Sequence, residues 1–151
     1  MDGKCTCGAV RYRLQAAPMF VMACHCTWCQ RETGTAFSWL ALIEMTQIAV
    51  LSGTVEMIAV PSPSGAGQWV RRCPECRVAL WSHYGGAGAE LAFVRVGTLE
   101  RPGEFPPQVH CYTSTKQDWL VLDGQVPTEP EGFEDEKYWP EESLSRQRAL
   151  Q

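Results

Sequence analysis

Apolar and polar residues alternate over short stretches along most of this chain. Val10, Tyr12 and Leu14 alternate with two arginines, which is typical of a strand with one buried face. Turn residues separate these stretches at intervals of about ten residues, and this spacing predicts an all-β fold with one or two short helices. The other predicted strands span residues 19–23, 36–43, 46–53, 54–60, 68–73, 78–84, 91–99 and 108–114.

Two segments depart from the strand pattern. Residues 27–33 predict a short helix with Thr27 as its N-cap and Gly34 as its terminator. Residues 128–151 are acidic and then amphipathic, and Pro140 followed by two glutamates predicts a helix start. We expect this C-terminal segment to be a solvated or loosely docked, partly helical tail, with Trp139 and Phe133 as the residues that would pack if it contacts the body or a partner chain.

Composition narrows the class of protein. A chain of 151 residues with 45% hydrophobic and 20% charged residues has the size and balance of one folded domain, which we assign to residues 1–127. The net charge of −4 and the lack of a basic run argue against a nucleic-acid partner. The polar N-terminal residues and the short apolar runs predict a cytoplasmic protein with no membrane partner.

The cysteines carry the chemistry of this sequence. In a reducing compartment, clustered cysteines are more often metal ligands than disulfides. Cysteines that serve only as small buried hydrophobic residues would not be expected to cluster in the sequence. Of the eight cysteines, only Cys111 fits such a packing role. The other seven lie at spacings of two or three residues: Cys5 and Cys7, Cys24, Cys26 and Cys29, and Cys73 and Cys76.

Seven ligands divide into four and three. Four thiolates make a closed, structural zinc site, whereas three leave one coordination position open for chemistry. The local trio Cys24, Cys26 and Cys29 can bind one ion from a single turn of chain. The two remaining pairs would then share a second ion that links the N-terminus to the middle of the chain. We therefore expect two zinc ions.

The motifs "GKCTCGAVRY", "CHCTWCQRETGTAF", "RRCPECRVALW" and "QVHCYTSTKQDW" resemble the glutathione-dependent formaldehyde-activating enzyme family, which includes centromere protein V. The resemblance covers roughly residues 3–127. It implies a β-tent fold with a structural zinc on the quartet Cys5, Cys7, Cys73 and Cys76, and a catalytic zinc on the trio Cys24, Cys26 and Cys29. The chain departs from the family pattern at Arg77, where glycine is usual, and at Cys111 and Asp118.

A sulfur-rich zinc site suits the capture of another thiol better than the ionisation of water. The resemblance implies that glutathione, as co-substrate, adds to formaldehyde or a related small aldehyde to give S-hydroxymethylglutathione. The reverse reaction would be that of a carbon–sulfur lyase. The alternative is a non-enzymatic zinc scaffold or protein-interaction module, in which Cys111 could close the trio as a fourth ligand. The sequence is compatible with a homo-oligomer.

The sequence indicates few candidate residues for contacts with the substrate. Arg31 is the candidate for a glutathione carboxylate, although it could equally be a solvated charge on the helix face. His25, between two ligands, is expected in a supporting or surface position. His83 is expected to be structural. Four further residues could either contact the site or have a purely structural role: Trp28, Phe37, His110 and Lys116.

Overall fold

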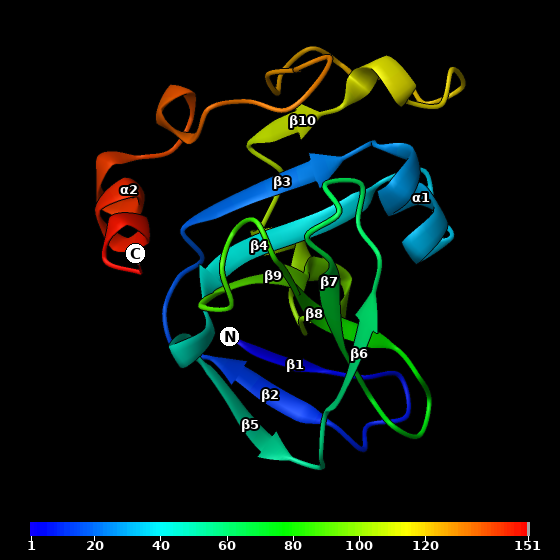
Figure 1. The fold of residues 1–151 in the computed structure, drawn as a ribbon, viewed down its shortest axis with the longest axis vertical. Helices are drawn as coiled ribbons and strands as arrows, with labels where there is room; N and C mark the ends of the chain where they lie inside the picture. The colour runs from blue at the N-terminus through cyan, green and yellow to red at the C-terminus, as the bar shows by residue number, and fades with distance from the viewer. Residues whose placement is uncertain (151) are drawn as a thin grey trace.

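Two β-sheets form the body of the protein in the computed structural model, which describes residues 1–150. The smaller sheet has the strand order β1-β2-β5, and the larger has the order β10-β3-β4-β9-β8-β7-β6 (Figure 1). Among the neighbouring strands of residues 1–150, β10 and β3 pair in parallel and every other pair is antiparallel. The strands are β1 (Asp2–Lys4), β2 (Arg11–Leu14), β3 (Phe20–Cys24), β4 (Ser38–Glu44), β5 (Ile48–Ser52), β6 (Glu56–Val60), β7 (Gln68–Arg72), β8 (Ala79–Tyr84), β9 (Leu91–Arg95) and β10 (Val109–Cys111).

The helical elements are short. Helix α1 (Thr27–Thr33) follows β3, and α2 (Glu141–Arg148) ends the chain. Single 3₁₀ turns connect other elements: η1 (Met45–Gln47), η2 (Val96–Thr98), η3 (Pro102–Glu104), η4 (Thr113–Thr115) and η5 (Asp135–Lys137). The mainly-β class expected from the sequence is confirmed.

The space between the two sheets holds the main core. Tyr12 of β2 and Trp81 of β8 are almost completely buried there, with ring centroids 5.4 Å apart. The Tyr12 hydroxyl hydrogen-bonds Thr98 at 2.6 Å, because a buried phenol needs a polar partner. This contact explains why the strand predicted for residues 91–99 stops at Arg95: the chain turns through η2 to bring Thr98 to Tyr12.

Two other strand predictions differ from the structure. Strand β1 was missed because its three residues show no apolar alternation; backbone pairing with β2 holds it. The strand predicted for residues 108–114 is confined to Val109–Cys111, since Tyr112 adopts the left-handed conformation at φ 55° and ends it.

The C-terminal segment packs on the body, so the expectation of a solvated or loosely docked tail is wrong. Trp139 stacks on Phe20 of β3 with centroids 5.3 Å apart, and Leu144 of α2 is buried in the same cluster. Arg146 holds Glu44 at the end of β4 through two hydrogen bonds of 2.7 and 2.6 Å. Figure 1 shows α2 beside the start of β3. The helix start predicted at Pro140 is confirmed, whereas the boundary at residue 127 stays a prediction.

Candidate metal centres and adjoining cavities

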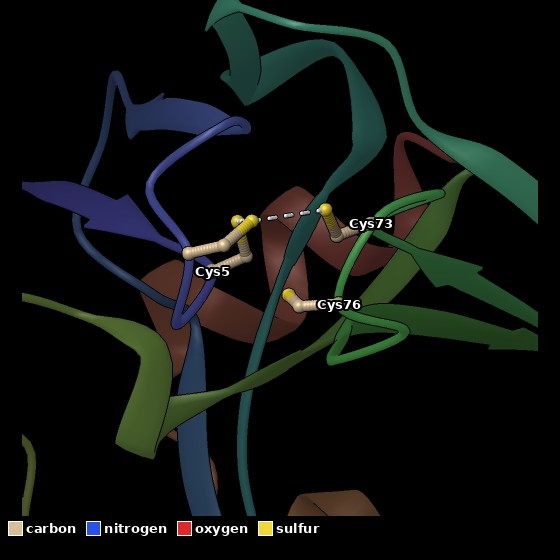
Figure 2. A group of neighbouring side chains, drawn as sticks. Cys5, Cys73 and Cys76 are labelled. Carbon is tan, nitrogen blue, oxygen red and sulfur yellow. Dashed lines mark hydrogen bonds between the residues drawn. The ribbon is translucent and has the colours of Figure 1, made fainter.

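The N-terminal turn and the loop after β7 bring four cysteines together. The Sγ atoms of the quartet lie within 4.8 Å of one another. Figure 2 shows Cys5 approaching the loop that carries Cys73 and Cys76. The sulfur of Cys7 lies 3.4 Å from that of Cys5 and 3.7 Å from that of Cys73. Tetrahedral zinc with Zn–S bonds of 2.3 Å needs sulfurs about 3.8 Å apart, so the quartet could hold zinc.

Backbone turns beside the cysteines position the four sulfurs of this quartet. Gly8, in the turn after Cys7, has φ 79°, a positive value that glycine adopts without steric cost. At the equivalent point of the second pair, Arg77 also takes a positive φ of 64°, so the chain accepts the left-handed conformation where glycine is usual. Backbone N–H groups of Cys7 and Val78 lower the pKa of Cys76 to about 6, which favours its thiolate form.

A second cluster forms where β3 passes into α1. The sulfurs of the trio Cys24, Cys26 and Cys29 lie within 4.8 Å of one another, so the trio also could hold zinc. The N-cap of α1 is Cys26 and not Thr27: the Cys26 sulfur accepts the Cys29 N–H at 3.3 Å. A sulfur can replace the expected hydroxyl because capping needs only an acceptor at that point. Gly34 ends the helix at φ 68°, as predicted.

The three sulfurs of the trio compete for protons. The neighbouring thiols of Cys24 and then Cys29 lower the pKa of Cys26 to about 2, while Cys24 and Cys26 raise the pKa of Cys29. Three thiolates at this separation repel one another, so a cation is needed for all three to ionise. The donor set is therefore chemically suited to a soft divalent ion.

Cys111 lies on β10 in register with Cys24 of the neighbouring strand. Its thiol points toward the Ala23 carbonyl at 3.8 Å, and it does not belong to the group of sulfurs within 4.8 Å. The thiol also raises the pKa of Cys24. Cys111 is thus a buried neighbour of the trio, and this geometry gives no support to a fourth ligand.

Two cavities meet at Cys24. The larger, of about 480 Å³, is lined by all three cysteines of the trio together with Trp28, which donates to Gln68 at 3.2 Å. The smaller, of about 410 Å³, extends toward the C-terminal segment. Four residues line both cavities: Met22, Cys24, Phe93 and Tyr112. The trio therefore faces a space of ordinary ligand size.

An ion-pair network fixes the helix that carries Cys29. Glu32 of α1 accepts hydrogen bonds from Arg72 of β7 and, at 3.0 Å, from Arg95 of β9. Arg72 also donates at 3.1 Å to the carbonyl of Arg77, in the loop that holds the quartet. Arg95 reaches Ser38 of β4 at 3.3 Å. The Glu32 carboxylate thus ties α1 directly to β7 and β9, and it reaches β4 through Arg95 and the other cysteine cluster through Arg72.

Gln30 makes a second set of ties from α1. Its side-chain amide donates to the carbonyls of His25 and Thr115 at 2.6 and 2.9 Å, and its oxygen accepts from Gln117 at 2.7 Å. These bonds fasten the trio's helix to the segment after β10. Neither network was predicted, because most of these partners lie forty or more positions apart and no local sequence pattern marks them.

The remaining candidates are placed as follows. Arg31 is exposed in the last turn of α1 and does not line either cavity, so its role as a carboxylate partner stays a prediction. His25 is fully buried, which excludes a surface position; its Nε2 lies 2.9 Å from Nδ1 of His110. Burial, then His110 and Lys116, lower the pKa of His25 to about 4. The Phe37 ring lies 5.1 Å from that of His25.

Lys116 and His83 have structural partners. The Lys116 ammonium donates to the carbonyls of Gln117 and Leu120 at 2.9 and 2.7 Å, so it holds its own loop. His83 is buried with Nδ1 3.2 Å from the Leu91 carbonyl, as expected for a structural histidine. Among residues 1–150, no helix has the length and apolar character to cross a bilayer.

Comparison with known proteins finds similar sequences and a similar fold. The profile of a family described as "Glutathione-dependent formaldehyde-activating enzyme" matches residues 1–115. A Halomonas elongata protein named "Putative glutathione-dependent formaldehyde-activating enzyme" is 25% identical over 134 residues, which cover 83% of this chain and 82% of that protein. A crystal structure of a Rhodobacter sphaeroides protein superposes with a TM-score of 0.52 at 20% identity, covering 85% of this chain and 99% of the other; this likeness concerns the fold alone.

Proposed function

The chain belongs to the glutathione-dependent formaldehyde-activating enzyme family, and from that premise we propose that its trio activates glutathione for addition to formaldehyde or a related small aldehyde. The supporting observation is that Cys24, Cys26 and Cys29 all line the 480 Å³ cavity while their sulfurs lie close enough to share one ion. The quartet has a structural role in this proposal, holding the N-terminal turn against the loop after β7.

In the proposed reaction, a carbon–sulfur bond forms between the thiol sulfur of glutathione and the carbonyl carbon of formaldehyde. The carbonyl π electrons move to oxygen, which takes up the proton released from the thiol, and the product is S-hydroxymethylglutathione. The reverse reaction is a carbon–sulfur lyase reaction. When bound to the trio, zinc would supply a soft Lewis acid that favours the thiolate form of an incoming thiol.

The residues of the chain supply position and a hydrogen-bond donor. The Cys26 cap and the Glu32 ion pairs fix α1, so that the trio keeps its spacing while the two reactants are held together. Tyr84 lines the cavity, and burial, followed by the charge of Cys29, raises the pKa of its phenol, which stays protonated at neutral pH. We assign to this phenol the role of hydrogen-bond donor to the carbonyl oxygen of the aldehyde, where negative charge develops as the thiol adds.

The test is the thermal stability of zinc-loaded protein with and without millimolar glutathione. Ligand binding to the folded state raises the melting temperature, so the wild type should be stabilised. The stabilisation should disappear in Cys26→Ser and persist in Cys111→Ser, which also removes a thiol beside Cys24 but leaves the trio intact. A wild type whose melting temperature does not respond to glutathione would rule the proposal out.

A further inference from the structure

The walls of the two cavities at the trio carry negative charge. Glu131 lines the larger cavity and Asp135 the smaller. Among the described residues that line either cavity there is no lysine, arginine or histidine. A thiol that enters beside Cys24 therefore meets carboxylates and no cationic side chain.

These two carboxylates have no cationic partner in the part of the chain that the structure describes. Glu131 accepts a hydrogen bond from the Ser114 hydroxyl at 2.8 Å, and Asp135 accepts one from the Gln147 amide at 2.6 Å. Neither acid takes part in the ion pairs of residues 1–150. Asp135 is half-buried and Glu131 is exposed, so their charges act on an occupant of the cavities through a field that solvent partly screens.

Apart from Glu131 and the trio itself, the polar lining of the larger cavity is neutral. Hydroxyl groups come from α1, from the loop before β7 and from the segment after β10, and they suit amide or hydroxyl groups of a ligand. These residues are Thr27, Ser62, Ser64, Ser114 and Thr115. The apolar part of the wall, with Met22 and Leu40, accommodates methylene groups.

We propose that this site selects its thiol by charge: it accepts thiols that are neutral or cationic near the sulfur and discriminates against those with a carboxylate there. The inference rests on the proposed function, because it concerns the thiol that the trio captures. Three thiolates around a divalent cation already leave a net charge of −1, and the wall carboxylates add to it. Glutathione then enters by its cysteinyl arm and keeps both carboxylates outside the cavity.

Three small thiols of similar size test the inference: cysteamine (cationic), 2-mercaptoethanol (neutral) and 3-mercaptopropionate (anionic). Their dissociation constants are measured on Co²⁺-loaded protein from the sulfur-to-cobalt absorption band, with thermal shifts of zinc-loaded protein as a second readout. Thiol acidity differs among these compounds, so each thiol is compared between wild type and Glu131→Gln. The control is Glu134→Gln, an equal charge change on an exposed residue that lines neither cavity.

Relative to wild type, Glu131→Gln should bind 3-mercaptopropionate about two- to fivefold more tightly and cysteamine more weakly by a similar factor. Its affinity for 2-mercaptoethanol should not change. The changes should shrink in 1 M salt, which screens exposed charges. Equal affinities in wild type and Glu131→Gln, or the same shifts in Glu134→Gln, would overturn charge selection while leaving thiol capture intact. Failure of all three thiols to bind the wild type would overturn the proposed function and this inference with it.

Discussion

Replacing Glu32 by glutamine tests whether the ion-pair network supports the trio. The side chains involved are shielded from water: Glu32 and Arg95 are each 10% exposed and Arg72 is 24% exposed. Glutamine keeps the shape and one acceptor oxygen but removes the negative charge. Two guanidinium groups would then face each other around a neutral amide, and Arg95, the more buried, would lose its counter-charge.

The expected cost follows from that burial. Hydrogen bonds to charged groups contribute about 1.5–3 kcal/mol each, and breaking a buried pair costs about 3–5 kcal/mol. Because the amide still accepts one bond and Arg72 is partly solvated, we expect Glu32→Gln to lose about 2–4 kcal/mol of stability. For a chain of this length the melting temperature should fall by roughly 5–12 °C. The affinity of the trio for Co²⁺ should fall too, since Glu32 anchors the helix that carries Cys29.

The assay combines denaturant unfolding with Co²⁺ titration, and the chain offers a matched control. Glu56 pairs with Arg77 near the quartet, but these side chains are 44% and 62% exposed, so Glu56→Gln should cost no more than about 1 kcal/mol. If the two variants lose equal stability, or if Glu32→Gln binds Co²⁺ at the trio as tightly as wild type, the reasoning is refuted.

Three further changes have defined outcomes. Cys73→Ser should give insoluble or non-cooperatively unfolding protein, because structural zinc contributes about 10–16 kcal/mol; a soluble variant with a sharp thermal transition would count against the quartet. Glu44, whose pKa the Arg146 guanidinium lowers, should stabilise the docked C-terminal helix fully above pH 4.5 and lose this effect as pH falls further. Hydrogen exchange in residues 141–148 should therefore rise more steeply below pH 4.5 in wild type than in Glu44→Gln. Gly53→Ala should lower the melting temperature by several degrees, because Gly53 has φ 76° and a Cβ there would lie 2.3 Å from the Ala9 carbonyl oxygen; an unchanged melting curve would contradict this packing.

Local patterns accounted for much of the fold and for the grouping of the cysteines. Alternation identified β2, and the apolar run of β9 marked a strand that is buried along its whole length. The spacing of the trio placed its sulfurs together because a strand end and one helical turn keep them close. Joining the quartet across more than sixty residues depended on counting ligands, and the structure brings those four sulfurs into one group.

The errors and omissions share a cause, which is contact between segments distant in sequence. The sequence of the C-terminal segment predicts a solvated tail because acidic residues dominate its composition. In the structure, Trp139 and Leu144 provide the apolar contacts that dock it on the body. His25 is expected from the sequence in a supporting or surface position, and its burial against His110 of β10 leaves only the supporting one. Glu32 looks like an ordinary helix-surface charge until the sheet brings two arginines to it.

Zinc quantification on purified protein, wild type beside Cys26→Ser, tests most directly the division into a closed quartet and an open trio. We predict two zinc ions per chain in the wild type and one in a folded Cys26→Ser variant, because only the trio loses a ligand. A single zinc in the wild type, or two retained in Cys26→Ser, would contradict that division.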